Sequence, residues 1–164
     1  HEIIDDIYDD ITLRATTNQR RLSIQLEPAL PTIYADKTSL TQAITNLIDN
    51  AVKYSKPNGE IQIRVFKQGG DVNFQVIDQG IGMPSSVLNN LFHRFYRSHR
   101  SKQQVGGTGI GLFITKIIVD AHHGQITVSS EPDKGTTFTI SLPVDPTQTV
   151  RSDNFIHNHG MIRK

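Results

Sequence analysis

Two apolar alternations on either side of a glycine pair constrain the fold of this chain most strongly. Apolar residues occupy every second position of 61–65 and again of 72–76, and Gly69-Gly70 lies between the two runs. Alternation with period two is typical of strands with one buried face, and a glycine pair favours a tight antiparallel turn. We therefore expect a sheet, one face of which is covered by other elements.

The other elements follow from periodicity and from capping residues. Helical spacing of apolar residues predicts a helix over 3–11, and alternation predicts a strand over 22–26. Asp36 predicts the capped start of a second helix, whose apolar stripe runs from Leu40 to Ala51. The remaining expected elements are a helical turn within 85–92, a helix over 112–121 that Gly124 terminates, and a closing hairpin of 126–128 and 138–142.

Length and charge exclude several classes of protein. The chain has 164 residues, which suits one domain, expected over 1–143, followed by a polar C-terminal tail over 144–164. Lys plus Arg number 17 and Asp plus Glu number 16, so no overall charge favours nucleic acid or an anionic membrane as a partner. Any phosphate binding must therefore come from local geometry.

Composition also bears on the compartment. Cysteine is absent, which excludes disulfides and thiolate metal sites and fits a reducing compartment. No apolar run approaches the roughly 20 residues of a membrane helix. We expect a cytoplasmic domain that does not itself insert into a membrane. Because the chain begins with His1 rather than Met, this expectation is compatible with a larger parent protein that contains a membrane anchor or a further domain.

Three polar residues share one face of the second helix. Asn46, Asn50 and Lys53 are spaced i, i+4, i+7, beside the apolar stripe. Amide oxygens suit a hard cation such as Mg²⁺, and a lysine suits phosphate. This face is therefore a candidate for the wall of a cleft; the alternative is an ordinary solvated helix face.

An Asp-x-Gly-x-Gly motif follows the second strand of the first hairpin. Asp78 is expected at the end of the strand, where Gly80 and Gly82 allow the chain to turn or hinge. A carboxylate in this place can accept a hydrogen bond from an exocyclic amine. A common turn is the equal alternative.

A second glycine-rich motif, 106–112, runs directly into a helix. Backbone N–H groups at such a helix start can cradle phosphate. The motif lacks the Gly-Lys-Ser/Thr of a P-loop, and no strand leads into it as in a dinucleotide fingerprint. The long aperiodic stretch before it carries aromatic and basic residues such as Phe95 and Arg97, which could close over a polyphosphate or a partner protein. A surface loop explains the same residues.

The order of five motifs is more specific than any one of them. They are Asn46-Leu47-Ile48-Asp49-Asn50-Ala51-Val52-Lys53-Tyr54-Ser55, Asp78-x-Gly80-x-Gly82, the run from 92 to 97, Gly107-x-Gly109-x-Gly111-Leu112, and Gly135-Thr136-Thr137-Phe138. In this order, over roughly 36–143, they closely resemble the catalytic ATP-binding domain of sensor histidine kinases. The resemblance implies an α+β two-layer sandwich, with a mixed, mostly antiparallel sheet covered on one face by three helices, and a mobile ATP lid.

The resemblance also implies roles for individual residues. Asn46 and Asn50 would hold Mg²⁺ and phosphate oxygens, and Lys53 would contact phosphate. Tyr54 would flank the base, and Asp78 would receive the amino group of adenine. The remaining expected ATP-binding residues are the hinge glycines Gly80 and Gly82, the lid residues Phe92, Phe95 and Arg97, the phosphate-facing residues Gly107, Thr108, Gly109, Ile110, Gly111 and Leu112, and Thr137 near the adenine pocket.

The same ATP fold also serves DNA gyrase, a heat-shock chaperone and mismatch-repair ATPases. Those hydrolases carry a glutamate general base four residues before the metal-binding asparagine, whereas this chain has Asn46 there. A carboxamide cannot act as a general base. Transfer to a protein nucleophile is therefore favoured over hydrolysis.

The expected partner is a separate phosphoacceptor domain, of the same or a partner chain. His1-Glu2 does not continue into the family's phosphoacceptor motif, so the acceptor histidine is not expected in this chain. A response regulator would be served indirectly, by a parent kinase that is a homodimer. The alternatives are a nucleotide-sensing module that signals through lid closure, and a related ATPase or serine kinase of the same fold.

Overall fold

Nine helices and strands make up the part of the chain that the structure describes. The structure is a computed structural model, and it describes residues 1–94, 96 and 109–145. The elements are α1 (Glu2–Thr17), β1 (Arg21–Leu26), α2 (Lys37–Tyr54), β2 (Glu60–Gln68), β3 (Asp71–Asp78), α3 (Ser85–Leu88), α5 (Gly111–Ala121), β4 (Gln125–Glu131) and β5 (Gly135–Pro143).

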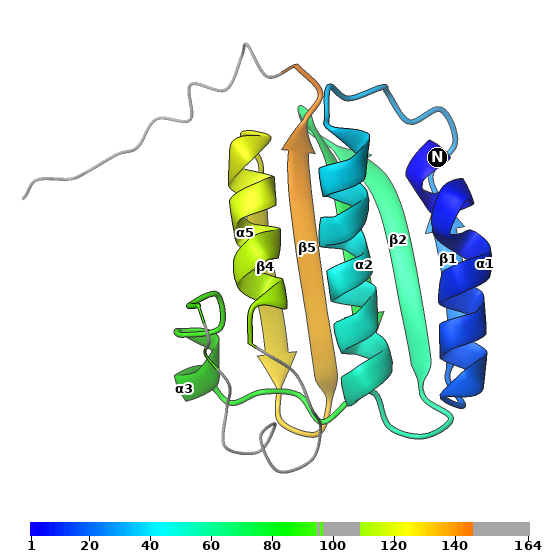
Figure 1. Ribbon diagram of the computed structural model, residues 1–164, viewed down its shortest axis with the longest axis vertical. Helices are drawn as coiled ribbons and strands as arrows, with labels where there is room; N and C mark the ends of the chain where they lie inside the picture. Colours follow the sequence, from blue (N-terminus) through cyan, green and yellow to red (C-terminus); the bar gives the residue numbers. More distant parts are fainter. Residues whose placement is uncertain (95, 97–108, 146–164) are drawn as a thin grey trace, which may run out of the picture.

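The strands form one mixed sheet in the order β1-β2-β3-β5-β4. β1 runs parallel to β2, and the other three pairings are antiparallel. α1, α2 and α5 lie side by side over one face of the sheet (Figure 1). The expected α+β two-layer sandwich, with a mostly antiparallel sheet covered by three helices, is confirmed.

Alternation along the strands explains which face the helices cover. In β2, Ile61, Ile63 and Val65 are buried, whereas Arg64 between them is exposed. β3 and β5 bury Val76 and Ile140 in the same layer. The far face of the sheet carries polar side chains instead, such as the pair formed by Gln75 Nε2 and Thr139 Oγ1 at 3.1 Å. The core therefore lies between the sheet and the helices.

Helix α2 is central to that core. It begins as the sequence predicts, because Asp36 caps it by accepting a hydrogen bond from the Ser39 N–H at 2.7 Å. Its stripe from Leu40 to Val52 is buried, and Leu47 and Ile48 have no exposed surface. The polar residues that the sequence marks as a candidate site, Asn46, Asn50 and Lys53, lie along one edge of this stripe.

Helix α5 ends at the expected residue. Its last residue is Ala121, and the left-handed position after it is occupied by His123 (φ 55°) rather than by Gly124. Gly124 is needed for close approach to β5: a Cβ there would lie 2.7 Å from the Ser141 carbonyl oxygen. His122 ties this helix end to α2, because its Nδ1 lies 2.7 Å from the Ile118 oxygen and its Nε2 accepts the Asp36 N–H at 2.9 Å.

Within the residues described here, none of the helices combines the length and the apolar character of a membrane span. The expected tail falls from residue 146 onward outside the described residues. The short helix α3, at Ser85–Leu88, lies inside the expected helical turn and is followed by turns.

Candidate functional site

Four segments that the sequence marks as candidates converge at one end of the sheet. α2 and β3 end there, and β5 and α5 begin there (Figure 1). The convergence follows from the topology, because β5 pairs with β3 in the antiparallel direction and α5 packs beside α2. The end of α2, Asp78, the start of β5 and the start of α5 therefore surround one region.

Asn46 joins α2 to the first turn of α5. Its amide nitrogen donates to the Gly111 carbonyl oxygen at 3.3 Å and to the Thr115 hydroxyl at 3.4 Å. The Thr115 hydroxyl in turn donates to the Gly111 oxygen at 3.0 Å, and Thr115 has no exposed surface. The amide oxygen of Asn46 remains an acceptor for a cation or a donor.

The rest of this face of α2 lies toward the helix end. Asn50 and Lys53 are half-buried. The ammonium of Lys53 lies 5.6 Å from the centre of the Tyr54 ring, within cation–π range. The ammonium of Lys53 could therefore partner a phosphate, and the ring of Tyr54 could stack on a base.

Asp78 is a buried carboxylate at the end of β3. Its side chain is 7% exposed and accepts the Gly80 N–H at 2.8 Å. Burial raises the pKa of Asp78 to about 6, although hydrogen bonds from the backbone of Gly80 and Thr136 oppose this rise. At neutral pH the carboxylate is mostly ionised, so a further N–H donor would stabilise it.

The glycines after Asp78 allow two close approaches. Gly80 forms a β-bridge with Ser55, and a Cβ on it would collide with the Tyr54 carbonyl oxygen. Gly82 has a left-handed φ of 59°, and a Cβ there would collide with the Glu131 carbonyl. This segment is therefore packed between the end of α2 and the turn before β5. Its role as a hinge stays a prediction.

Thr136 is a candidate site residue that the sequence reasoning did not single out. The register pairs Thr136 with Asp78, whereas Thr137 pairs with Ile77. Because side chains alternate between faces, Thr136 lies on the face of Asp78 and Thr137 on the other. Thr136 is 7% exposed, and its hydroxyl lies 2.9 Å from the Ser130 hydroxyl. The Gly-Thr-Thr-Phe motif was the available signal, but only the register distinguishes its two threonines.

The start of α5 is a helix N-terminus without a side-chain cap. Ile110 is the N-cap and contributes no side-chain cap bond, and Gly109 before it is left-handed with φ 72°. A helix start with free N–H groups attracts anions. Gly111 and Leu112 form the first turn. Phe92, which is expected in the lid, is partly buried and packs against the hydrophobic core. Four further residues expected around the phosphates and in the lid lie outside the described residues; they are Phe95, Arg97, Gly107 and Thr108.

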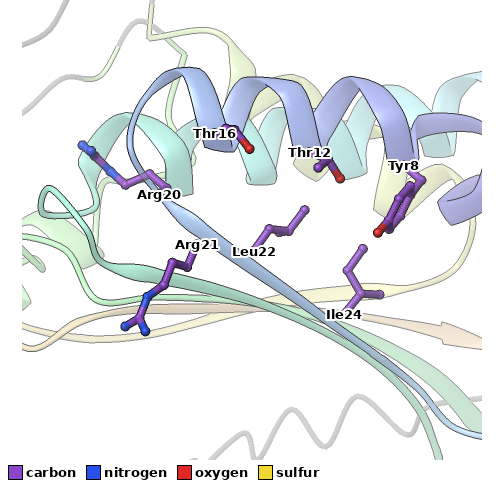
Figure 2. A pocket seen from close by; sticks show the side chains of 7 residues that line it. All are labelled: Tyr8, Thr12, Thr16, Arg20, Arg21, Leu22 and Ile24. Carbon is purple, nitrogen blue, oxygen red and sulfur yellow. The ribbon is translucent and has the colours of Figure 1, made fainter.

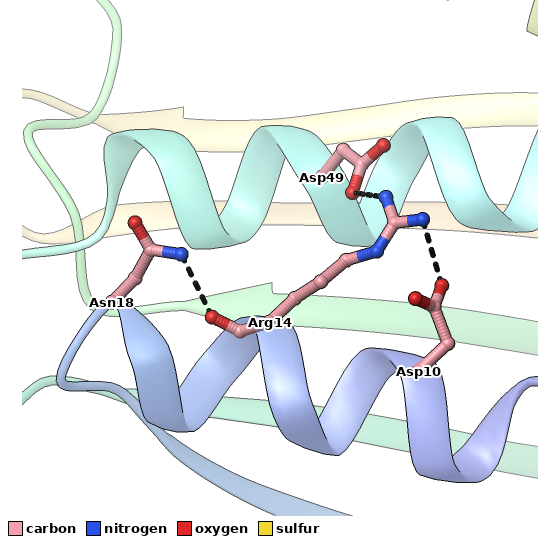
Figure 3. A network of polar contacts seen from close by, with 4 residues as sticks. All are labelled: Asp10, Arg14, Asn18 and Asp49. Carbon is pink, nitrogen blue, oxygen red and sulfur yellow. Dashed lines mark hydrogen bonds and ion pairs between the residues drawn. The ribbon is translucent and has the colours of Figure 1, made fainter.

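An ion pair joins α2 to α1 through Asp49, the residue next to Asn50 in the sequence. Arg14 of α1 donates to Asp49 at 2.7 Å and pairs with Asp10 at 2.7 Å (Figure 3). Hydrogen bonds to Asp10 and Asp49 raise the pKa of Arg14. Asp49 directly precedes Asn50. No pattern in the sequence indicates this pairing, because the two residues are 35 positions apart.

Comparison with known proteins identifies this arrangement. Residues 35–146 match the family described as histidine kinase-, DNA gyrase B- and HSP90-like ATPases. The chain belongs to this ATPase family. The match begins just before the cap of α2 and ends after β5, so all of the candidate site lies within it.

Relatives of this ATPase domain are sensor histidine kinases. The circadian input-output histidine kinase CikA of Synechococcus elongatus is 40% identical over 126 residues, which are 76% of this chain and 17% of CikA. The mycobacterial sensor histidine kinase MprB has a TM-score of 0.75 at 29% identity, covering 87% of this chain and 92% of that structure. Full-length ShkA in complex with AMPPNP has a TM-score of 0.76 at 26% identity, covering 88% of this chain and 31% of ShkA.

These comparisons confirm the resemblance read from the motifs. The domain is the ATPase domain of the sensor histidine kinase type, a class of two-component signalling proteins. The chain spans about a sixth of the length of CikA, one of its curated relatives.

Proposed function

We propose that this domain binds Mg-ATP at the end of the sheet where α2, β3, β5 and α5 meet, and transfers the γ-phosphoryl group to a histidine of a separate phosphoacceptor domain. The observation that carries the proposal is Asp78. It is a buried, mostly ionised carboxylate with no cation among its hydrogen-bond partners in the described residues. Such a group favours a neutral N–H donor, which the amino group of adenine supplies.

The nucleotide would lie between Asp78 and the start of α5. Thr136, beside Asp78 in the register, would contact the adenine with it, and Tyr54 would flank the base. Lys53 and the N–H groups of the first turn of α5 would face the phosphates, since a cation and a helix start both favour anions. The lid residues keep the roles that the resemblance implies.

The donor set fits a magnesium ion that arrives with the nucleotide. Within the described residues no group of three or more His, Cys, Asp or Glu side chains could hold a metal ion. Asn46 and Asn50 offer neutral amide oxygens. Mg²⁺ keeps several waters and is commonly bound through one or two protein oxygens plus substrate phosphates. The ion would neutralise charge on the phosphates, and the asparagines would orient it.

Transfer then requires no general base from this chain. The acceptor imidazole supplies its own lone pair: its nitrogen forms a bond to the γ-phosphorus while the bond to the bridging oxygen of ADP breaks. Asn46 occupies the place of the water-activating glutamate in the related hydrolases, and it is bonded to α5. A response regulator would receive the phosphoryl group next, and the parent kinase would be a homodimer.

The test is a transfer assay. The chain is mixed with a histidine phosphoacceptor domain and γ-labelled Mg-ATP, and the labelled protein is exposed to acid and to alkali. Acid-labile, alkali-stable label on the acceptor is expected, because phosphohistidine has this stability. Acid-stable label would instead indicate a serine kinase. ATP binding without label on any acceptor would favour the nucleotide-sensing module.

The role of the asparagines can be tested separately. Asn50→Ala should weaken ATP binding in the presence of Mg²⁺ by about tenfold and leave Mg-free binding nearly unchanged, because one oxygen ligand is lost. Calorimetric titration with and without EDTA measures both affinities. Equal losses under the two conditions would contradict a metal-directed role for Asn50.

A further inference from the structure

The outer edge of β1 is an unpaired sheet edge in the part of the molecule that the structure describes. β1 is the last strand of the sheet, next to β2. Arg21 donates its N–H to Gly59 at 3.0 Å and Glu27 donates to Val65 at 2.9 Å, both toward β2. Alternate residues of a parallel strand face its partner. Leu22, Ile24 and Leu26 therefore direct their N–H and C=O groups outward.

A groove lies between this edge and α1. Tyr8, Thr12 and Thr16 project from α1 toward β1, and Leu22 and Ile24 project from β1 toward α1, with Arg20 and Arg21 at one end (Figure 2). Tyr8 is 51% exposed although it lines the groove. The groove thus has an apolar floor directly beside unpaired backbone groups, which is the combination that β-strand addition uses.

The walls also contain buried polar atoms that lack partners. Thr12 Oγ1 and Arg20 Nε are inaccessible to solvent and have no hydrogen-bond partner among the described residues. The guanidinium of Arg20 is otherwise bonded to the carbonyl oxygens of Asn18 and, at 2.7 Å, Ser55. Because both atoms are inaccessible, they are part of the packing between α1 and β1 and do not contact an occupant of the groove.

The position of α1 decides what kind of occupant fits. α1 lies over the outermost strand (Figure 1). A helix with its side chains is about 10–12 Å wide, and neighbouring strands are about 4.8 Å apart. α1 therefore extends over the place of a sixth strand. A second copy paired antiparallel along this edge would bring two α1 helices closer than the roughly 8–10 Å of helix packing, whereas a single extended peptide avoids that clash.

Charge sets the polarity of that peptide. Asp5 and Asp9 precede Tyr8 and Thr12 by three positions, so they flank the groove side of α1. They lie toward the Leu26 end of β1, because α1 runs back along the strand (Figure 1). The exposed Arg21 and the half-buried Arg20 mark the other end. The groove is therefore acidic at one end and basic at the other.

We propose that this groove binds an extended peptide as a sixth strand, antiparallel to β1, with basic residues at its amino end and acidic residues at its carboxyl end. Alternate apolar side chains of the peptide lie against Tyr8, Leu22 and Ile24. Its backbone pairs with the outward groups of Leu22, Ile24 and Leu26. The antiparallel direction rests on the slightly greater stability of antiparallel pairs, and with that direction the charges of the groove set which end of the peptide is basic.

The probe is a labelled peptide that begins with lysines, alternates valine and threonine in its middle and ends with glutamates. Its length is about eight residues, because about eight residues at roughly 3.3 Å each span β1. Binding to the full chain is measured by fluorescence anisotropy and amide hydrogen exchange. We expect slower exchange at Leu22, Ile24 and Leu26. Ser23 and Gln25 should not change, because they already face β2. Unchanged exchange at the three outward amides under saturating peptide would overturn the proposal.

Two matched pairs sharpen the test. Ile24→Pro removes an outward N–H without removing a bond to β2, and should weaken binding by about tenfold more than Ile24→Ala, which keeps that N–H. Equal effects of the two would contradict backbone pairing.

The second pair tests the charges. A peptide with its two charged ends exchanged should bind the natural chain more weakly than the original peptide does. It should bind the Arg21→Glu variant more tightly than the original peptide does. Equal binding of both peptides would refute the polarity, and protection of the same amides by self-association alone would assign the edge to a second copy.

Discussion

Helix α2 pairs with α1 on one side through ion pairs at the surface. On the other side it is hydrogen-bonded to α5 through the neutral amide of Asn46 and packs against β3 in the interior. On the α1 side, Arg14 pairs with Asp49 and Lys37 pairs with Asp6 at 2.7 Å, and all four side chains are at least 41% exposed. On the site side, Asn46 reaches the fully buried Thr115, and Asp78 is buried without a cation.

The difference in burial between the two sides of α2 separates interactions that stabilise the fold from groups that are available to a ligand. Exposed ion pairs contribute about 0–1 kcal/mol each and weaken with salt. Buried groups have larger effects, which include a cost when a charge lacks a partner. The site side should therefore dominate pH dependence and nucleotide binding, and the α1 side should contribute modestly to stability.

The largest expected effect is the pH dependence of stability due to Asp78. Its pKa is about 6 in the folded domain and 3.8 in the reference state, so the folded state binds more protons between these values. The free energy of unfolding should therefore fall as pH rises from about 4 to about 6, by about 3 kcal/mol from this group. Urea unfolding at several pH values measures it.

The control for this prediction is Asp78→Asn, which cannot ionise. The difference in unfolding free energy between the natural domain and this variant isolates Asp78 from other titrating groups. If that difference stayed constant between pH 4 and 6, the buried carboxylate would not have a raised pKa, and the contrast between the two sides of α2 would weaken.

The next effect concerns the nucleotide. Asp78→Asn should reduce ATP affinity by about ten- to a hundredfold and abolish the preference for ATP over GTP, since a hydrogen bond to a charged group contributes about 1.5–3 kcal/mol. Calorimetric titration with both nucleotides measures this. The matched control is Asp49→Asn on the α1 side, which should change ATP affinity by less than about twofold. Unchanged affinity and selectivity in Asp78→Asn would refute the role assigned to it.

Much of this site could be predicted because its signals are local. The cap at Asp36 and the shared face of Asn46 and Asn50 depend on helical spacing, and Asp78 at a strand end depends on alternation. Choosing between Thr136 and Thr137 depended on the β3–β5 register, which is a long-range property. Helix α5 ends at Ala121 as predicted, but the glycine at 124 did not reveal that His123 takes the left-handed position after the helix.

On the α1 side, the features that the sequence did not indicate are long-range as well. Alternation identified the strand over 22–26, but its place at the outer edge is a matter of topology. The pairing of Arg14 with Asp49 depends on how α1 crosses α2, and charged residues on helices are common. Pairwise contacts between distant elements therefore had to come from the structure.

A smaller effect is expected at the α2–α5 contact. Asn46→Ala should lower the free energy of unfolding by about 1 kcal/mol, because two long hydrogen bonds are lost while Thr115 still bonds the Gly111 oxygen. Asn46→Asp should cost more, because its oxygens would face that carbonyl. Denaturant unfolding at low and high salt measures both. Strong salt dependence of the Asn46→Ala effect would contradict a neutral contact.

The smallest effect is expected at Arg14. Arg14→Ala should cost less than about 1 kcal/mol at low salt, and the cost should shrink on adding salt, because the paired groups are exposed and screened. Arg14→Lys is the matched control: it keeps the charge but lacks the planar fork that reaches Asp10 and Asp49 together, so it should fall between the natural domain and the alanine variant. Denaturant unfolding and ATP titration at two ionic strengths measure the pair. A loss of ATP affinity in Arg14→Ala beyond about twofold would mean that the two sides of α2 are coupled through Asp49 and its neighbour Asn50, and that α1 helps to set the nucleotide site.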